Sequence, residues 1–388
     1  MYFIPEYVQK VINTLEDSGH EAFIVGGPVR DMLLGTTPDD FDITTSCLPD
    51  EIMGLFQKTI ATGIKHGTVT VVMDNKNIEV TTYRTDGQYL NHRSPEKVNF
   101  VSSINEDLSR RDFTVNAMAY NKNSGIIDLF GGKADLKRGI IKCVGNPETR
   151  FTEDALRILR ALRFAAKLNF KIEADTLQGI KKTLHLLSGI SRERIFSELS
   201  KILISKKPQV IETLINLGGL KFLGIEKISL AAALSVLPSS LPIRFYAFCN
   251  ICRIDANVLC RELKTDNNLK NYCLKMDRLF ENGTDFSKVG LKQMLNIADI
   301  NIVNEFLLLL NALKGVEISP AKERLNEIAV NNEPYLISHL ELDGNDIIGS
   351  GFSNERVGIV LKQLLEKVIE NPKLNNKKDL TDILNTIQ

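Results

Sequence analysis

The sequence contains no tryptophan, and aromatic residues make up only 7% of its 388 residues. Its six cysteines are too few for a disulfide-based fold. No run of 18 apolar residues occurs, and the first residues, MYFIPEYVQK, lack the basic and then apolar regions of a secretory signal. We therefore expect a cytoplasmic protein that does not interact with a membrane.

The sequence also lacks an excess of charge of either sign. It has 48 Lys and Arg residues and 48 Asp and Glu residues. A protein-wide positive field, which many nucleic-acid-binding proteins use, is therefore excluded, and local basic patches would have to bind any nucleic acid. Three basic clusters could contact phosphates or could equally lie on solvated faces: Lys181-Lys182, Arg192 with Arg194, and Lys206-Lys207.

Histidine and cysteine give little support for a metal centre. The five histidines are scattered along the chain and form no HxxxH pair. Cys249 and Cys252 form a CxxC motif, but the surrounding segment is apolar and helix-like and lacks the turns of a zinc knuckle. Buried thiols are the favoured interpretation, and the sequence assigns these two cysteines no other role.

The pattern of apolar residues changes near residue 146. Before it, AFIVGG is typical of a strand entering a glycine turn, and GTVTVVMD, NKN and IEVTTYR of a β-hairpin. After it, long helical periodicities dominate. Since a domain takes roughly 150 residues or fewer, we expect several domains. The predicted division is an α+β domain over 1–145 and three helical domains over 146–205, 206–300 and 301–388.

The most informative stretch is IVGGPVRDMLLGTTPDDFDITT, which runs from Ile24 to Thr45. A Gly-Gly turn and Arg30 precede Asp40 and Asp42, whose spacing would place both carboxylates on one face of a strand. Two such charges repel unless a cation lies between them, and Mg²⁺ accepts carboxylate, phosphate and water oxygens. The stretch therefore predicts a site for nucleotide phosphates and their metal ions, although an isolated DxD is more often a plain surface strand.

Two further segments could complete such a site. Glu79, on the predicted hairpin, could supply a third carboxylate, although by itself it would be an ordinary solvent-facing residue. Arg110, Arg111 and Asp112 precede an apolar run that we interpret as a helix or its approach. Arginine offers a rigid five-donor group suited to phosphate and ribose oxygens, yet an isolated RRD is more often a solvated helix start.

The segment FTEDALRILRALRFAAKL is predicted to form one amphipathic helix that begins at Phe151. Asp154, Arg157 and Arg160 then lie on an i, i+3 ridge opposite the apolar arc. Arg163 continues this ridge. The alternative is an exposed helix with ion pairs along its surface.

Asp154 and Arg157 have complementary hydrogen-bonding capacity, because a carboxylate only accepts hydrogen bonds and a guanidinium only donates them. Cytosine and adenine offer an amino donor beside a ring-nitrogen acceptor, whereas uracil and guanine present the reverse order. A fixed Asp–Arg pair would therefore accept C and A and reject U and G without a nucleic-acid template.

Together these motifs resemble a known family. GGPVRD with DFD, EVTTYR, RRDFTVNAMAY, IDLFGGKADL, EDALRILRALRF and SRERIFSEL occur in the order and spacing of the class II tRNA nucleotidyltransferases. These are the CCA-adding enzymes of the DNA-polymerase-β-like superfamily, close kin of bacterial poly(A) polymerases. The resemblance is strong over roughly the first 200 residues and weaker in LELDGNDIIGSGF and the segment after it. It implies an α+β fold in which a polymerase-β-like head precedes an all-α neck, body and tail in an elongated arrangement.

The resemblance also implies an activity, a cofactor and partners. The activity is template-independent addition of C, C and A to the 3′ end of tRNA from CTP and ATP, with release of pyrophosphate. Two Mg²⁺ ions would serve as cofactor. The partners would be ATP, CTP and the acceptor stem and elbow of tRNA, bound by a monomer or a homodimer.

The roles of individual residues follow from the same resemblance. Asp40 and Asp42 match the metal-binding pair, and Glu79 matches the position proposed for a third catalytic carboxylate. Eight residues match positions that bind the nucleotide: Gly27, Arg30, Arg111, Asp112, Asp154, Arg157, Arg160 and Arg163. Among these, Asp112 would contact the ribose, and the last four would read the base and hold its phosphates.

Two alternatives remain open. Enzymes that add only A and poly(A) polymerases share these motifs, although GIKHGTVTVV is more similar to the CCA-adding branch. YRTDGQYLNHRSPEKV resembles a flexible loop that CC-only enzymes lack, which disfavours CC-only addition. A catalytically inactive tRNA-binding protein is the alternative from another class, and the intact Asp40, Asp42, Glu79 and Arg111 argue against it.

Overall fold

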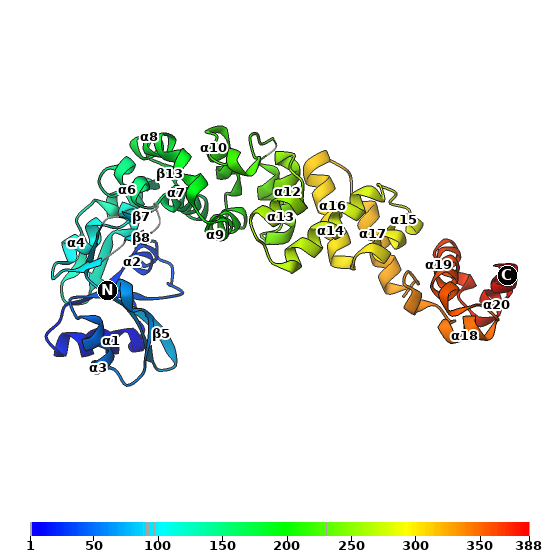
Figure 1. Ribbon diagram of the computed structural model, residues 1–388, viewed down its shortest axis with the longest axis horizontal. Helices are drawn as coiled ribbons and strands as arrows, with labels where there is room; N and C mark the ends of the chain where they lie inside the picture. Colours follow the sequence, from blue (N-terminus) through cyan, green and yellow to red (C-terminus); the bar gives the residue numbers. More distant parts are fainter. Residues whose placement is uncertain (1, 88, 91–93, 96–97, 230, 388) are drawn as a thin grey trace. The chain divides into compact units, whose positions relative to one another are not determined.

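The computed structural model describes residues 2–87, 89–90, 94–95, 98–229 and 231–387. Contacts divide the chain into two compact units, Met1–Ile228 and Ser229–Gln388. Strands and helices mix in unit 1 as far as residue 172, and helices follow in the described residues (Figure 1). The predicted α+β class, with a sheet-containing head before helices, is confirmed, while the division into four domains stays a prediction.

A seven-stranded sheet organises the head, with strand order β11-β10-β1-β2-β5-β4-β3. Its strands are β1 (Ala22–Val25), β2 (Asp42–Thr45), β3 (Thr59–Gly63), β4 (Thr68–Met73), β5 (Lys76–Thr82), β10 (Met118–Asn121) and β11 (Gly125–Asp128). The pair β2 and β5 is parallel, and the other neighbouring pairs are antiparallel. The parallel pair matters for the site, because it aligns Asp42 with Glu79.

Helices cover both faces of this sheet. Helices α1 (Glu6–Asp17), α2 (Gly27–Leu33) and α3 (Pro49–Leu55) pack on one face, where Ile24 of β1 is fully buried. Helix α4 (Ile104–Ser109) packs on the other face against Phe23 and Val25. Because side chains alternate along a strand, β1 is apolar on both sides. The resulting rigid sheet supports the residues at the ends of its strands.

The predicted hairpin is confirmed, because β4 and β5 pair antiparallel. Asp74 and Asn75 form its turn with φ of 50° and 59°, a conformation that Asp and Asn tolerate. The segment that we expected to be a loop, 85–97, contains short paired strands in its described part. These are β6 (Arg84–Asp86) with β9 (Val98–Phe100) and β7 (Tyr89–Leu90) with β8 (Ser94–Pro95). Residues 88, 91–93 and 96–97 of the predicted flexible loop lie outside the described residues.

The prediction of a helix after Arg110 and Arg111 was wrong. One 3₁₀ turn, Thr114–Asn116, leads directly into β10, which lies between β1 and β11 and is buried along its whole length. A strand buried on both faces has the same continuous apolar pattern as a short buried helix, so periodicity alone cannot separate them. Helix α5 (Gly132–Arg138) was also not predicted from the sequence.

The single helix predicted from Phe151 is in fact two helices. Helix α6 (Pro147–Glu153) ends before Asp154, whose backbone is extended at φ −135° and ψ 103°, and α7 (Leu156–Leu168) follows. The Asp154 carboxylate accepts a hydrogen bond from the Leu156 backbone N–H at 3.1 Å. Aspartate often competes with helical hydrogen bonding in this way. Asp154 therefore lies at the break between the helices, and the predicted ridge begins at Arg157.

Unit 1 continues with short strands β12 (Ile140–Ile141) and β13 (Lys171–Ile172) and helices α8 (Ala174–Thr183), α9 (Arg192–Leu203) and α10 (Ile211–Asn216). Helix α9 packs against α7 (Figure 1). This contact brings the SRERIFSEL motif next to the arginines of α7.

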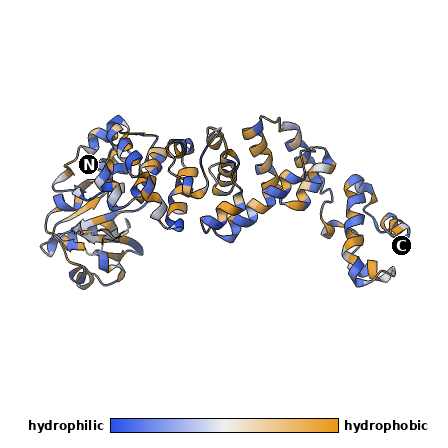
Figure 2. Cartoon of the chain, turned by 45° about the horizontal axis from the view of Figure 1, so that its top comes forward, coloured by the Kyte–Doolittle hydropathy of each residue, from blue (hydrophilic) through white to orange (hydrophobic). Residues whose placement is uncertain are grey.

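In unit 2, all the described elements are helices: α11 (Ala233–Val236), α12 (Leu241–Cys252), α13 (Ala256–Glu262), α14 (Asn267–Glu281), α15 (Lys288–Ile297), α16 (Ile300–Lys314), α17 (Ser319–Val330), α18 (Gly344–Gly349), α19 (Asn354–Glu370) and α20 (Lys377–Ile387). Figure 2 shows apolar residues recurring among polar ones along these helices. Cys249 and Cys252 are buried within α12, as the sequence indicated.

Among the described residues, no single helix is both long and apolar enough to cross a membrane, although α15 and α16, bent by 116° at their junction, reach that length and apolarity as a pair.

Candidate active site

A cavity of about 1280 Å³ in unit 1 gathers residues from the head, α7 and α9. Its lining includes nine of the predicted site residues: Gly27, Arg30, Asp42, Arg111, Asp112, Asp154, Arg157, Arg160 and Arg163. The two remaining ones, Asp40 and Glu79, lie beside Asp42. Positions spread over more than a hundred residues of sequence thus meet at one place.

Three carboxylates form a cluster at the start of β2. Asp42 is the first residue of this strand and pairs in register with Glu79 on β5. Asp40 lies in a bend just before the strand, so the prediction that both aspartates belong to one strand was wrong in this detail. Phe41 and Ile43 are buried in the core, which directs Asp42 away from it.

The charge of this cluster is incompletely balanced. Desolvation and the neighbouring Glu79 carboxylate raise the pKa of Asp42 to about 6, Asp40 adds to this effect, and Arg111 opposes it. A raised carboxyl pKa means that the ionised form is disfavoured by its surroundings. A cation bound here would remove that penalty, so the donor set fits a hard divalent ion.

The Gly-Gly turn brings the backbone close to an arginine. Gly26 has φ of 78°, and a Cβ at this position would lie 3.2 Å from Nη1 of Arg111. Glycine is therefore needed here for both its conformation and its small size. The sequence prediction selected Gly27, which begins α2, whereas Gly26 carries the steric constraint. The sequence feature that pointed to both Gly26 and Gly27 was a predicted strand followed by two glycines.

Arg30 and Arg111 are held by polar groups that the sequence analysis did not single out. Arg30 is buried and donates to Asn116 Oδ1 at 2.7 Å. Arg111 donates to Asp107 Oδ2 at 3.1 Å, and Arg110 donates to Asp107 Oδ1 at 2.7 Å. Burial by itself raises the pKa of Asp107, but Arg111 and Arg110 outweigh it and lower that pKa below its usual value. The i, i+3 and i, i+4 spacing from Asp107 could have indicated these pairs.

Asp112 joins the head to α7. Its Oδ2 accepts hydrogen bonds from Nε and Nη2 of Arg160 at 2.8 and 2.6 Å, and its Oδ1 accepts one from the Phe113 backbone N–H at 2.8 Å. Burial raises the pKa of Asp112, and Arg160 more than compensates, so the pKa lies below its usual value. The carboxylate is thus charged and fixed in orientation, and it holds Arg160 in turn.

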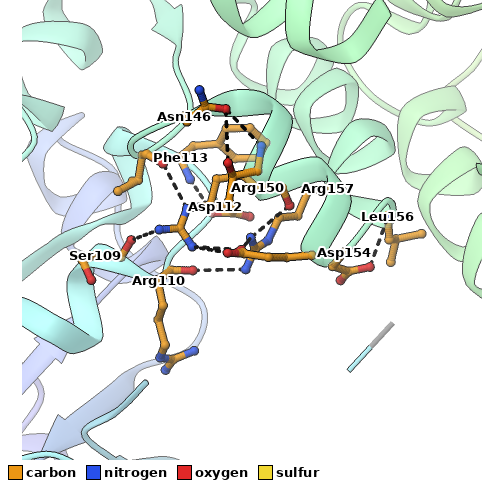
Figure 3. A network of polar contacts seen from close by, with 12 residues as sticks. Ser109, Arg110, Asp112, Phe113, Asn146, Arg150, Asp154, Leu156 and Arg157 are labelled. Carbon is orange, nitrogen blue, oxygen red and sulfur yellow. Dashed lines mark hydrogen bonds and ion pairs between the residues drawn. The ribbon is translucent and has the colours of Figure 1, made fainter. Parts of the chain in front are cut away.

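Asp154 and Arg157 line the same cavity but are oriented by different partners (Figure 3). Arg157 is buried and donates to Glu153 Oε2 at 2.6 Å and to the Arg110 carbonyl at 3.1 Å. Asp154 accepts a hydrogen bond from Nη2 of Arg194 at 3.1 Å. Both side chains are therefore fixed before a nucleotide binds.

Helix α9 supplies site residues whose role the sequence analysis missed. Arg194, predicted only as part of a phosphate-binding or solvated cluster, lines the cavity and pairs with Asp154. Glu198 is buried and pairs with Arg163 at 3.2 Å. The SRERIFSEL motif was visible in the sequence, but nothing local indicated that it would meet α7.

Comparison with known proteins places the chain in a family. Residues 22–142 match the model of the poly A polymerase head domain, and residues 169–225 match that of the probable RNA and SrmB-binding site of polymerase A. A CCA-adding enzyme of Staphylococcus haemolyticus (strain JCSC1435) is 35% identical over 386 residues, which cover 96% of this chain and 95% of that protein. The chain belongs to the CCA-adding enzyme family.

Other CCA-adding enzymes are more similar over a shorter region. That of Ligilactobacillus salivarius (strain UCC118) is 51% identical over 209 residues, 53% of this chain and 52% of that protein. The chain thus spans about half the length of several curated relatives it matches.

Solved structures of CCA-adding enzymes share the fold. The Bacillus stearothermophilus CCA-adding enzyme in complex with CTP has a TM-score of 0.86 and 30% identity, covering 99% of this chain and 98% of that one. The Thermotoga maritima CCA-adding enzyme complexed with tRNA_CCA has a TM-score of 0.72 and 22% identity, covering 100% and 97%, and it supports the fold alone.

Proposed function

We propose that this chain adds C, C and A to the 3′ end of tRNA from CTP and ATP and releases pyrophosphate. The observation that carries the proposal is one cavity lined both by Asp42, beside its carboxylate neighbours, and by Asp154 and Arg157. The first group suits phosphoryl chemistry, and the second suits base selection. Membership of the CCA-adding enzyme family supports this combination.

Asp40 and Asp42 would hold two Mg²⁺ ions, with Glu79 as the third carboxylate of the cluster. The fit rests on the oxygen donors and on the raised pKa of Asp42, whose largest cause is desolvation and whose second is the neighbouring Glu79 carboxylate, since a bound cation would offset both. Bound Mg²⁺ would lower the pKa of the RNA 3′-hydroxyl and neutralise charge on the departing pyrophosphate.

The arginines of the cavity would bind the triphosphate and orient it. In the reaction the RNA 3′-oxygen attacks the α-phosphorus in line, a new P–O bond forms, and the bond to the β,γ-diphosphate breaks. Arg30, Arg160 and Arg163 are each tied to a carboxylate of the protein: Asp31, Asp112 and Glu198 respectively. Groups that are already oriented stabilise developing charge without a reorganisation cost.

Asp154 and Arg157 would select the base. The Asp154 carboxylate would accept a hydrogen bond from the amino group of C or A, and Arg157 would donate one to the adjacent ring nitrogen. U and G would leave both groups unpaired or opposed, and discrimination of this kind reaches the order of 10⁴-fold. Arg194 holds the Asp154 carboxylate in place, and the carboxylate would still have capacity to accept a further hydrogen bond.

The experiment that tests this function uses three RNAs, each with CTP or ATP: tRNA lacking CCA, tRNA lacking only the terminal A, and an RNA unrelated to tRNA. A CCA-adding enzyme extends the first with C and the second with A. Extension of the second alone would identify an A-adding enzyme. Extension of the unrelated RNA with ATP would identify a poly(A) polymerase, and binding of tRNA without extension would indicate an inactive tRNA-binding protein.

A further inference from the structure

Three arginines converge on the ring of Phe164, a residue of α7 to which the sequence analysis assigned no role. The guanidinium carbon of Arg163 lies 4.4 Å from the ring centroid, that of Arg30 5.4 Å and that of Arg160 5.5 Å. Phe164 is only 7% exposed, yet it lines the cavity. The ring is therefore a common contact for arginines from two separate elements, α2 and α7.

Such a group of cations is electrostatically strained. Burial lowers the pKa of Arg163, and Arg160 and Arg30 lower it further, while Glu198 and Asp112 oppose them. The face of an aromatic ring carries partial negative charge and attracts cations within about 6 Å of its centroid. Phe164 thus offers each of the three arginines an attractive surface that partly offsets their mutual repulsion.

The ring is itself held in place. Phe113 contacts it edge-to-face, with centroids 5.8 Å apart and ring planes at 76°. Phe113 is fully buried, and its backbone N–H donates to Asp112, the partner of Arg160. The orientation of Phe164 and the position of the arginine partners are therefore set by the same packed segment.

We propose that Phe164 is a positioning residue that sets the spacing of Arg30, Arg160 and Arg163 for the triphosphate of the incoming nucleotide. This inference rests on the proposed function, because it assigns the three arginines to the nucleotide phosphates. The proposed role of Phe164 differs from a purely structural one because it requires the negative face of the ring. A leucine would fill most of the same apolar volume but would offer no such face.

The test is equilibrium binding of CTP, ATP and inorganic triphosphate to the full chain in Mg²⁺. The variants are Phe164→Leu, Phe164→Tyr and a chain carrying pentafluorophenylalanine at position 164, which keeps the ring shape but removes its negative face. Phe170→Leu is the matched control. Phe170 follows the end of α7, and its ring lies beside Gly139 and does not line the cavity.

Phe164→Leu and the fluorinated chain should bind all three ligands more weakly by the same factor, about ten-fold, because three cation–ring contacts are lost together. Phe164→Tyr and Phe170→Leu should bind like the unaltered chain. In tRNA extension assays, Phe164→Leu should raise KM for CTP and ATP alike and leave kcat within about two-fold, because the contact of the arginines with the triphosphate is weakened equally in the bound nucleotide and in the transition state.

Unchanged triphosphate binding together with weaker CTP binding would overturn the proposal, because Phe164 would then act on the base or ribose. Normal binding by the fluorinated chain would overturn it as well, as would an equal loss in Phe170→Leu. If the unaltered chain bound none of the three ligands, the proposed function itself would fail, which is a distinguishable result.

Discussion

The carboxylates at the start of β2 and the arginines around Phe164 lie at the same cavity but differ in how their charge is balanced. Asp42, beside Asp40 and Glu79, carries a raised pKa of about 6. Asp112 is buried among arginines, and its pKa is below the usual value. Carboxylates of the protein thus offset part of the charge of the arginines, whereas the surroundings of Asp42 on balance disfavour its ionised form.

The largest expected effect comes from the carboxylates. Asp42→Ala should lower the rate of nucleotide addition by at least about 10³-fold, because it removes a group on which metal binding and charge stabilisation depend. Single-turnover extension of tRNA measures this, and a filter-binding assay should show unchanged tRNA affinity. Asp50→Ala, at an exposed position on α3, is the control. Turnover near the normal rate at saturating Mg²⁺ would exclude Asp42 as a metal ligand.

The second prediction concerns selectivity. Asp154→Ala should reduce the preference for C and A over U and G from the order of 10⁴-fold toward ten-fold, because the acceptor for the amino group is lost. Competition between CTP and UTP, measured as kcat/KM, reports this change. Glu148→Ala on α6, which removes an exposed ion pair with Lys182 of α8, should leave selectivity intact. Retained selectivity in Asp154→Ala would refute the idea of a protein template.

The third prediction concerns stability. Asp112→Asn should lower the free energy of unfolding by about 2–3 kcal/mol, since it leaves Arg160 without its buried carboxylate partner. Because the folded-state pKa of Asp112 is lowered, its contribution is present above its unfolded pKa and is lost as pH falls through the folded value. The difference in stability between the variant and the unaltered chain should therefore shrink in acid. A difference that stays constant down to low pH would contradict this assignment.

The smallest expected effect is a change in pKa, and measuring it compares Asp42 with Asp112 directly. In metal-free protein, the carboxyl carbon of Asp42 should titrate near pH 6 and that of Asp112 below its usual range. Glu79→Gln should lower the pKa of Asp42, because Glu79 is the strongest of the neighbouring charges that raise it. Carbon-13 NMR follows both groups. An unaltered Asp42 titration in Glu79→Gln would show that the two carboxylates do not interact.

Local patterns predicted much of the head. The strand entering the Gly-Gly turn and the β4–β5 hairpin each depend on residues adjacent in sequence, and both occur. The prediction failed at residues 118–121 because the sheet offers a position between β1 and β11, where they form the buried strand β10. The single helix predicted from Phe151 failed for a local reason, because the Asp154 carboxylate accepts a hydrogen bond from the Leu156 backbone N–H at the break between α6 and α7.

In the site, too, some residues were predicted from the sequence and others were recognised only in the structure. The sequence selected Asp40, Asp42, Arg111, Asp154 and Arg157 as candidates, because their residue types and spacing suit the chemistry and because the assembled motifs resemble a known family. The partners that orient them, Asp107, Glu153 and Arg194, and the ring of Phe164, were recognised only in the structure. A partner role depends on distance in space, and several of these partners come from other segments of the chain.

The sequence by itself therefore determined the chemical groups available: paired aspartates after a glycine turn, and an aspartate and arginines at the start of a helical region. Only the tertiary structure decided that Asp42 stands opposite Glu79 and that three arginines share the ring of Phe164. The physical reason is that strand register and helix packing set distances of a few ångströms between residues far apart in sequence. Charge balance, and with it pKa and orientation, depends on those distances.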